Sequence, residues 1–459
     1  MLCREFVDRE HELEILERCW SERPCFVVVY GRRRIGKTRL VKEWLRGKPY
    51  VYYLAQLASH EYNLRRFAEA CSRSLNDPLI ARLSPTTLTD LLQLVVERHG
   101  DLAIVIDEFT YWVRSSPRVL SELQQFVDEI LPRTRVALVV LGSLVGVMES
   151  SVLGGGSPLY GRARYRIKLS QLPPWYVKSF VPSYEPEKIV AIYALFGGIP
   201  FYLCMLDPRQ SFEENLRRLL IEPGAPVRTE RELLLREELR DPHTYNAVLS
   251  AIARGYDTPA KIAQITGLDP SHVSKYLNTL EYLGFVEREV PLFHKRGRYR
   301  ISDPILRTWY HLIEPVQELL DLEAFDEAFS AVMARLDTYV ATVWEEIVGI
   351  YLEKILCIEG YRIRGKLVKK GEEIDIALLD PDRKRIVVVE AKWSSIDLSE
   401  AERIKRRLAS RAPRLVPEDY SIEKIFVAAK RFEGDEKPSW VIDSRDVIEL
   451  KPLAEISDR

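Results

Sequence analysis

A glycine-bearing loop at residues 31–38 carries residue types that bind phosphate. Its sequence, Gly31-Arg-Arg-Arg-Ile-Gly36-Lys37-Thr38, fits the phosphate-loop pattern G-x-x-x-x-G-K-[ST]. Glycines let backbone N–H groups turn inward toward phosphate oxygens, and the N-terminus of a following helix adds partial positive charge. We expect Lys37 to reach the β- and γ-phosphates of a nucleotide and the Thr38 hydroxyl to hold Mg²⁺.

The flanks of this loop predict a strand before it and a helix after it. Residues 26–30 are apolar and of β type, and residues 39–45 have helical spacing. A chance match in a glycine-bearing loop is the alternative, and the agreement of both flanks disfavours it. Arg34, like its neighbours Arg32 and Arg33, either contacts phosphates or is a solvated loop charge.

Two acids end the next apolar strand. Residues 102–106 read Leu-Ala-Ile-Val-Ile and are followed by Asp107 and Glu108. The carboxyl end of a buried parallel strand opens on the ligand crevice, so this is the pattern of a Walker B strand. Asp107 would orient the Mg²⁺ shell and Glu108 would polarise the attacking water. An ordinary strand followed by an acidic turn is the alternative.

Two further residues are candidates for the same site. Residues 135–142 predict another core strand, and Ser143 at its end is placed to contact the γ-phosphate or water. Arg162 follows a glycine-rich loop, where an arginine can neutralise charge that develops on the γ-phosphate. A solvated loop arginine is the alternative for Arg162.

The C-terminal part has a different constellation of acids and a lysine. Residues 373–379 and 385–392 predict a strand hairpin. If its turn centres between residues 382 and 383, Asp375 lies opposite Glu390, about 5 Å away on one face. Lys392 shares that face because side chains alternate along a strand. Two carboxylates and an ammonium suit Mg²⁺ binding and water activation, whereas a half-exposed hairpin with a surface ion pair is the alternative.

Residues 241–302 have the element order of a winged helix-turn-helix. Three predicted helices (245–253, 259–266 and 271–283) precede two strands (284–291 and 298–301). Thr258 and Pro259 predict the start of the second helix, and an inward face is expected for Val273, Leu277 and Leu280. The residues expected to contact nucleic acid are His272, Lys275 and Asn278 on the third helix, with Lys295, Arg296 and Arg298 on the wing. A protein-interaction or lid-coupling module is the alternative.

Composition limits the function classes. The chain has 459 residues, 46% hydrophobic and 29% charged, which fits two to four globular domains. A net charge of −1 excludes a global field that attracts nucleic acid, so only local patches could bind it. The six cysteines are scattered, which argues against a zinc site or a disulfide framework and for a reducing compartment. With no signal peptide and no bilayer-length apolar run, a cytoplasmic protein without membrane contact is expected.

Several segments resemble the archaeal ATPase family, within the STAND class of AAA+-related P-loop NTPases. In chain order they are Phe6-Val-Asp-Arg-Glu-His-Glu-Leu13, the phosphate loop, Ile106-Asp-Glu-Phe109, Gly142-Ser143, Leu159-Tyr-Gly-Arg162 and Gly197-Gly-Ile-Pro200. The resemblance implies ATP and Mg²⁺ as ligands. The last segment is similar to that class's helical-lid signature, which would place Pro200 near the nucleotide.

Residues 299–310 also resemble that family, where they link the winged helix to a C-terminal domain. That domain is similar to the PD-(D/E)XK nuclease fold. This resemblance implies that Asp375 and Glu390 ligate Mg²⁺ and that Glu345 supports the metal from the preceding helix. It also implies that Lys392 orients or deprotonates the attacking water.

The predicted fold class is α/β, with a parallel P-loop NTPase sheet, a helical lid, a winged helix-turn-helix and an α/β PD-(D/E)XK nuclease-like domain. The predicted boundaries are 1–185 (ATPase), 186–240 (lid), 241–302 (winged helix), 303–340 (helical linker) and 341–459 (nuclease-like domain). The leading expectation is an ATP-hydrolysing protein that acts on nucleic acid, with DNA favoured. A nucleotide-controlled signalling switch is the alternative, and homo-oligomerisation is left open.

Overall fold

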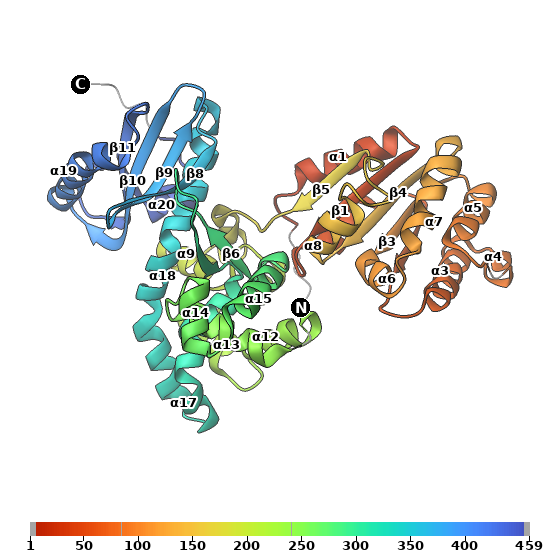
Figure 1. Ribbon diagram of the computed structural model, residues 1–459, viewed down its shortest axis with the longest axis horizontal. Helices are drawn as coiled ribbons and strands as arrows, with labels where there is room; N and C mark the ends of the chain where they lie inside the picture. The colour runs from red at the N-terminus through yellow and green to blue at the C-terminus, as the bar shows by residue number, and fades with distance from the viewer. Residues whose placement is uncertain (1–5, 84, 240, 454–459) are drawn as a thin grey trace. The chain divides into compact units, whose positions relative to one another are not determined.

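The computed structural model describes residues 6–83, 85–239 and 241–453, which fold into two compact units (Figure 1). The N-terminal unit comprises residues 6–171 and 199–201, and the C-terminal unit comprises residues 172–198 and those from 202 onward. Cys3 and the predicted domain limits at residues 1, 240 and 459 lie outside the described residues. The five-domain division stays a prediction.

The N-terminal unit is built on a five-stranded parallel sheet in the order β2-β3-β4-β1-β5. The strands are β1 (Cys25–Gly31), β2 (Tyr50–Leu54), β3 (Asp101–Asp107), β4 (Arg135–Gly142) and β5 (Tyr165–Leu169). The central strands are apolar along their length because both faces of a parallel sheet are covered by helices. Tyr30 pairs with Gly142, and Val140 pairs with Ile106. The carboxyl ends of β1, β4 and β3 therefore meet at one edge, with β4 in the middle.

Helices cover both faces of this sheet. Figure 1 shows α1 (Glu10–Ser21) on one side and α3 (His60–Leu75) and α5 (Leu88–Arg98) on the other. Phe67, Trp112 and Val28 belong to the core on the α3 side. The other helical segments of the unit are α2 (Lys37–Trp44), α4 (Pro78–Arg82), α6 (Phe109–Ser115), α7 (Val119–Gln125), η1 (Phe126–Ile130), η2 (Leu131–Arg133), α8 (Val145–Val147) and η3 (Met148–Val152).

One disulfide is present in this unit. Cys19, near the end of α1, is bonded to Cys25 at the start of β1, and their Cα atoms are 5.5 Å apart. The expectation that the cysteines form no disulfides is therefore wrong for this pair. The cause is local, since residues 22–24 turn the chain back at a separation that suits a disulfide. Cys71 and Cys357 are free thiols.

A helix that spans a bilayer needs about 20 predominantly apolar residues. Within the described ranges, none combines the length and the apolar character that crossing a membrane requires.

The winged helix-turn-helix is confirmed within the C-terminal unit. Its elements are α13 (Pro242–Ala253), α14 (Pro259–Thr266), α15 (Pro270–Tyr282) and the antiparallel pair β6 (Val286–Glu289) and β7 (Arg298–Ile301). The start of α14 is as predicted, because the Thr258 side chain accepts from the Lys261 N–H and Pro259 occupies the first turn. Val273, Leu277 and Leu280 are buried, so the inward face of α15 is also confirmed.

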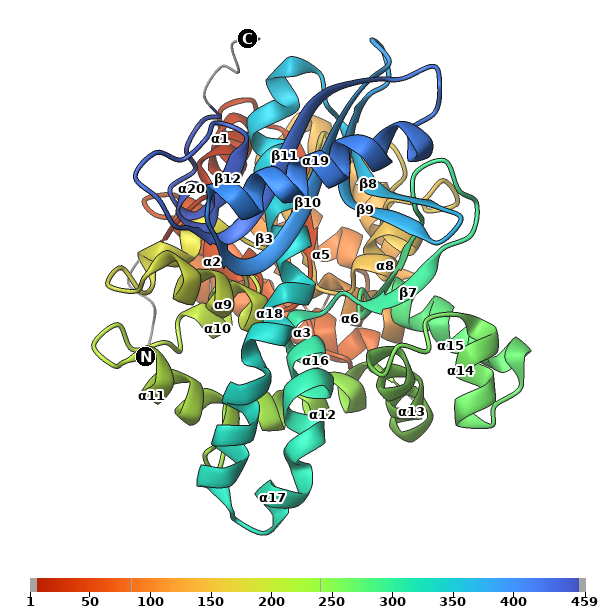
Figure 2. The same ribbon diagram turned by 90° about the vertical axis from the view of Figure 1, so that its left-hand side faces the viewer.

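A five-stranded mixed sheet in the order β12-β11-β10-β9-β8 follows. Its strands are β8 (Ile363–Lys369), β9 (Glu372–Asp380), β10 (Arg385–Ile396), β11 (Ser421–Phe432) and β12 (Val441–Asp443). Figure 2 shows α19 (Leu398–Leu415) lying across this sheet, where Leu408 packs with Val388. Long helix α18 (Phe325–Leu356) contacts the other face, since Trp344 packs on Trp393.

Further helical segments lie between these elements or after the last strand. They are η4 (Pro174–Ser179), α9 (Pro186–Phe196), α10 (Pro200–Leu203), α11 (Phe212–Leu216), η5 (Arg217–Ile221), α12 (Pro226–Glu238), α16 (Pro304–Thr308), η6 (Trp309–Ile313), η7 (Glu314–Val316), α17 (Gln317–Asp321), η8 (Cys357–Glu359) and α20 (Ser444–Ile448). Helix α18 runs without a break across residues 340 and 341.

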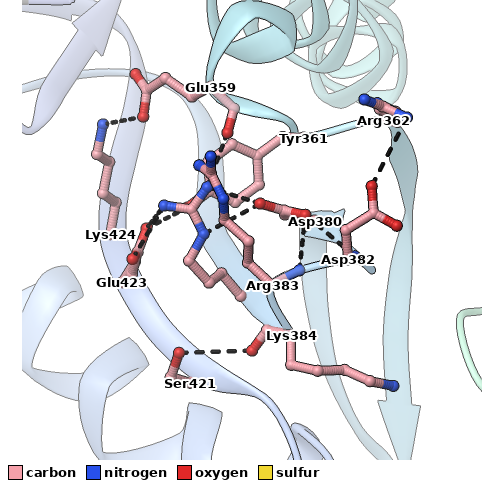
Figure 3. Close-up of polar contacts among 11 residues, drawn as sticks. Glu359, Tyr361, Arg362, Asp380, Asp382, Arg383, Lys384, Ser421, Glu423 and Lys424 are labelled. Carbon is pink, nitrogen blue, oxygen red and sulfur yellow. Dashed lines mark hydrogen bonds and ion pairs between the residues drawn. The ribbon is translucent and has the colours of Figure 1, made fainter.

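Polar contacts fix the register of the β9–β10 hairpin at its turn (Figure 3). Asp380 pairs with Arg385 in the ladder, and its Oδ2 accepts from Arg385 Nη2 at 2.6 Å. Asp380 Oδ1 accepts from the backbone N–H groups of Asp382 and Arg383. Arg385 also bonds Glu423 of β11 at 3.0 Å. The hydrogen bond from Arg385 is the main reason that the pKa of Asp380 lies below its usual range. The same contacts set the alignment of the β9–β10 residue pairs that follow the turn.

A buried ion pair attaches the winged helix to α18. Glu346 Oε2 accepts from Arg307 Nη1 at 3.0 Å and from Arg300 Nη1, on β7, at 3.2 Å. Burial alone would raise the pKa of Glu346, but the charges of Arg307 and Arg300 hold it below the usual value. Since a buried charge without a partner is costly, Glu346 ties β7, α16 and α18 together.

We predict that Glu346→Ala destabilises the protein by about 3–5 kcal/mol, because Arg307 would stay buried without its counter-charge. Urea unfolding monitored by tryptophan fluorescence would measure this. Glu327→Ala, at an exposed position of the same helix, is the control and should change the free energy of unfolding by no more than about 0.5 kcal/mol. Equal effects of both substitutions would contradict the role of Glu346.

Candidate functional site

The phosphate loop connects β1 to α2 in the predicted strand–loop–helix context. Arg34 has φ +66° and Gly36 has φ +98°, so the loop uses the left-handed region twice. Lys37 Nζ donates to the carbonyls of Gly31 at 2.8 Å and Arg32 at 2.9 Å. Burial lowers the pKa of Lys37 to about 8, although the charges of Glu108 and Asp107 oppose this. A bound phosphate would therefore supply the counter-charge that Lys37 lacks.

Asp107 lies at the centre of a hydrogen-bond cluster beside this loop. Its Oδ2 accepts from Thr38 Oγ1 at 2.6 Å and from the Tyr52 hydroxyl at 2.5 Å. Its Oδ1 accepts from the Glu108 N–H at 2.7 Å. The structure thus brings Thr38 and Asp107 together, as their predicted shared role requires. Two hard oxygen donors at this separation fit Mg²⁺.

Tyr52 is a residue that sequence reasoning missed. It lies on β2, which pairs with β3 so that Tyr52 is opposite Val105 and Leu54 is opposite Asp107. Burial, followed by the charge of Asp107, raises the pKa of Tyr52. No local pattern marks this tyrosine, because its contact depends on which strand neighbours β3.

Glu108 and Ser143 also meet. Ser143 follows β4, the strand between β1 and β3, and its Oγ donates to Glu108 Oε2 at 2.5 Å. Glu108 has φ +50°, an unusual conformation for a glutamate, which turns the chain at the end of β3. The two residues predicted for catalysis at this edge are therefore in direct contact.

The remaining predicted nucleotide residues divide into two groups. Pro200 lies beside the loop, since a Cβ placed on Gly36 would be 4.0 Å from Pro200 Cγ. The Arg34 guanidinium lies 4.1 Å from the ring centre of Phe201. By contrast, Arg162 forms a bidentate ion pair with Asp128 of η1, at 2.7 Å from Nε and 2.9 Å from Nη2. Arg162 must leave Asp128 before it can contact a phosphate.

The C-terminal carboxylates are placed by the hairpin register. The ladder pairs Ile376 with Val389, so Asp375 and Glu390 form the next pair on one face. Lys392 Nζ lies 2.9 Å from Glu390 Oε1 and 3.7 Å from Asp375 Oδ2. The Ala391 N–H donates to Asp375 Oδ2 at 2.8 Å. The predicted convergence of these three side chains is confirmed.

Asp375 is largely buried beside two other acids. Burial, the charge of Glu390 and the charge of Glu345 raise the pKa of Asp375 to about 6. Glu345 itself accepts from Lys366 Nζ at 2.6 Å. In the parts of the chain that the structure describes, no three His, Cys, Asp or Glu side chains are grouped closely enough to hold a metal ion. Glu345 is thus an electrostatic neighbour of Asp375 and does not complete a metal-ligand cluster here.

A cavity of about 650 Å³ opens on these carboxylates. Its other wall is helix α19, which contributes Arg407, Arg411 and Arg414. Arg411 Nη2 donates to Glu390 Oε2. These arginines were also missed by sequence reasoning, although the basic run at residues 403–414 is a visible signal.

The winged helix is attached to β8 through its wing. The Leu292 N–H donates to the Lys366 carbonyl at 2.8 Å, and His294 Nε2 lies 2.6 Å from the Val368 carbonyl. Phe293 packs edge-on against Tyr420. Within this module, the exposed residues among those predicted to contact nucleic acid are His272, Lys275, Asn278, Lys295, Arg296 and Arg298. Arg298 is paired with Asp257 at 3.4 Å.

We predict that Asp375→Asn stabilises the protein by about 1–3 kcal/mol at pH 8 without divalent cations. The raised pKa means that stability falls as pH rises from about 4 to about 6 and stays low above it. The gain from the amide should therefore shrink as pH falls below 6. Urea unfolding in EDTA at several pH values measures it, with Asp382→Asn at the exposed turn as the control. A loss of stability at pH 8 in Asp375→Asn would contradict this interpretation.

Comparison with known proteins gives three domain matches. Residues 6–206 match a family described as "ATPase domain predominantly from Archaea". Residues 247–290 match the IclR helix-turn-helix domain. Residues 309–404 match a family described as archaeal and bacterial proteins of unknown function.

Similar individual proteins agree with these matches. The uncharacterized protein MJECL04 of Methanocaldococcus jannaschii is 30% identical over 441 residues, which cover 94% of this chain and 97% of that protein. The uncharacterized ATP-binding protein MJ0423 of the same organism is 52% identical over 44 residues, which cover 9% of this chain and 75% of that protein. The Walker-type ATPase PABY2304 of Pyrococcus abyssi shares the fold, with a TM-score of 0.53 and 20% identity over 66% of this chain and 96% of that one. The chain is therefore an ATPase with a helix-turn-helix domain, and it belongs to the same family as MJECL04.

Proposed function

We propose that this ATPase acts on nucleic acid and that Asp375, Glu390 and Lys392 form a phosphodiester-cleaving site. The observation that carries the proposal is the contact of Lys392 Nζ with both carboxylates, at 2.9 Å and 3.7 Å. The helix-turn-helix domain supports nucleic acid, with DNA favoured, as the partner.

In the N-terminal unit, each residue of the phosphate-loop cluster has a separate task. Lys37 binds the β- and γ-phosphates, while Arg34 and Pro200 border the nucleotide. Thr38 and Asp107 would hold Mg²⁺, which neutralises phosphate charge when it is bound. Glu108 first gives up its hydrogen bond with Ser143 and then takes the proton from the attacking water. Arg162 reaches the γ-phosphate only when its ion pair with Asp128 opens.

In the C-terminal unit, the carboxylates and the lysine divide the work. Asp375 and Glu390 would hold a divalent cation, because both carboxylates converge on the same point as Lys392 and their hard oxygen atoms suit such an ion. The cation, when present, supplies charge for the developing phosphorane and a more acidic water. Burial opposes it, but the bond with Glu390 and the charge of Asp375 raise the pKa of Lys392, so the lysine stays protonated and orients that water or offsets charge on the phosphorane. Glu345 supports the site electrostatically.

In the winged helix, α15 is the reading element. His272, Lys275 and Asn278 are exposed on it, at positions that can reach base edges in a major groove. Lys295 and Arg296 are exposed positive charges on the wing, although the wing loop is hydrogen-bonded to β8. These residues position the nucleic acid through phosphates, and α15 supplies any sequence preference.

A nucleotide-controlled switch is the second candidate function. Two observations favour it: the wing loop is bonded to β8, and Glu390 is already paired with both Lys392 and Arg411. In that case the winged helix and the C-terminal sheet bind partners without cleavage.

For the ATP site we predict that Lys37→Ala abolishes nucleotide binding or weakens it greatly, since a desolvated phosphate charge loses its partner. Glu108→Gln should retain nucleotide affinity while turnover falls by about 10²-fold or more. Equilibrium binding of a fluorescent ATP analogue and phosphate release measure the two effects. Glu97→Gln, on the exposed face of α5, is the control. Unchanged affinity in Lys37→Ala, or normal turnover in Glu108→Gln, would refute the assigned role.

For the C-terminal site we predict cleavage of nucleic acid by the wild type in Mg²⁺ or Mn²⁺, and at least a ~10²-fold loss of it in Asp375→Ala and Lys392→Ala. ATP hydrolysis should persist in both variants because the phosphate-loop cluster is intact. Gel assays with single-stranded, double-stranded and branched DNA and with RNA, with and without ATP, provide the measurement. Asp382→Ala, at the far end of the hairpin, is the control.

Two results would favour the nucleotide-controlled switch over the cleavage site. One is no cleavage of any of these substrates by the wild type, and the other is equal cleavage by the wild type and both variants.

A further inference from the structure

Helix α19 carries an unusual concentration of positive charge. Residues 403–414 read Arg-Ile-Lys-Arg-Arg-Leu-Ala-Ser-Arg-Ala-Pro-Arg, which contains six cations and no acid, in a chain of net charge −1. A local patch of this kind is the feature that a nearly neutral protein needs in order to attract a polyanion.

Three of these cations form one row beside the candidate cleavage site. Arg407, Arg411 and Arg414 have i, i+4 and i+7 spacing, so they lie on one face of α19. All three line the cavity of about 650 Å³ on which Asp375 and Glu390 also open. The adjacent face of α19 is anchored to the sheet through Leu408 and Leu415, which fixes the direction of the row.

The present partners of the row leave it available to a ligand. Arg407 makes no ion pair or side-chain hydrogen bond with any residue that the structure describes. Arg414 is paired with Glu372 at 2.9 Å, but its side chain is 62% exposed, and such pairs contribute little. Arg411 is bonded to Glu390, and its Nε is buried without a hydrogen-bond partner.

Two cations of the wing are held in ion pairs. Arg300 is engaged by Glu346, Arg298 is paired with Asp257, and the loop around Leu292 is bonded to β8. Lys295 and Arg296, in its loop, and Arg288, on β6, are exposed and form no ion pair with the described residues. The α19 row is also nearer to the chemistry, because Arg411 contacts Glu390 directly.

We infer that the Arg407–Arg411–Arg414 row of α19 is the surface on which the sugar–phosphate backbone of the nucleic acid docks. This inference rests on the proposed function and names the contact that brings a phosphodiester to Asp375 and Glu390. Guanidinium groups suit phosphates because they offer paired, planar donors. The row spans roughly 10 Å of helix at 1.5 Å per residue. That length matches about three base-pair steps along the axis of a DNA duplex, at ~3.4 Å each.

The test compares three pairs of substitutions in the full chain. Arg407→Gln with Arg414→Gln removes two charges of the row and keeps helix-compatible side chains. Lys295→Gln with Arg296→Gln removes two charges of the wing. Arg209→Gln with Arg236→Gln removes two exposed charges elsewhere in the same unit and is the matched control. Binding of labelled single-stranded and duplex DNA is followed by anisotropy in EDTA, between about 50 and 200 mM salt.

We expect the α19 pair to weaken binding by about 10- to 100-fold, irrespective of sequence, and to lower the salt slope by about two units. The control pair should change neither quantity, and ATP hydrolysis without DNA should be normal in all variants. If the variant with the α19 pair of substitutions binds DNA as well as the control variant does, the inference is overturned. The proposed function would still be supported by DNA binding of the wild type. The inference is overturned in the same way if only the wing pair binds DNA more weakly. It is also overturned if the row binds an acidic protein and not DNA. No DNA binding by the wild type would overturn both.

Discussion

Burying a charged side chain costs several kcal/mol unless a partner offsets the loss of water, and this constraint distinguishes the structural charges of the protein from those available for chemistry. Asp380 is buried and Glu346 is largely buried, and arginines hold the pKa of each below its usual value. Lys37 and Asp375 are also largely buried, but their pKa values are shifted toward the neutral form. The first two charges are satisfied within the protein, whereas the last two gain from a ligand of opposite charge: a phosphate for Lys37 and a cation for Asp375.

The charges that are paired within the protein help to position the residues of the candidate sites. Asp380 and Arg385 fix the register of the hairpin at one end, and that register puts Asp375 beside Glu390 at the other. Glu346 holds β7 and α16 against α18, next to Glu345. In the N-terminal unit, the sheet order has the equivalent task, since β4 lies between β1 and β3 and brings Ser143 to Glu108.

Features that depend on nearby residues could be predicted from the sequence. The phosphate loop, the start of α14 at Pro259 and the pairing of Asp375 with Glu390 all follow from short spacings or a single turn. The contact of Tyr52 with Asp107 depends on sheet order, and the attachment of Leu292 to β8 joins segments about 70 residues apart in the chain. The Cys19–Cys25 disulfide depends on a local turn, but the scattered cysteine pattern of the whole chain gives no sign of it.

If this ATPase acts on nucleic acid, as proposed, its ATP turnover should respond to nucleic acid. The most direct measurement is the steady-state ATP turnover of the full chain as DNA is added, at low and at high salt. The account predicts a saturable change in turnover at low salt that weakens as salt rises, because the association is electrostatic. Turnover that is the same with and without single-stranded, duplex and branched DNA or RNA at low salt would contradict it.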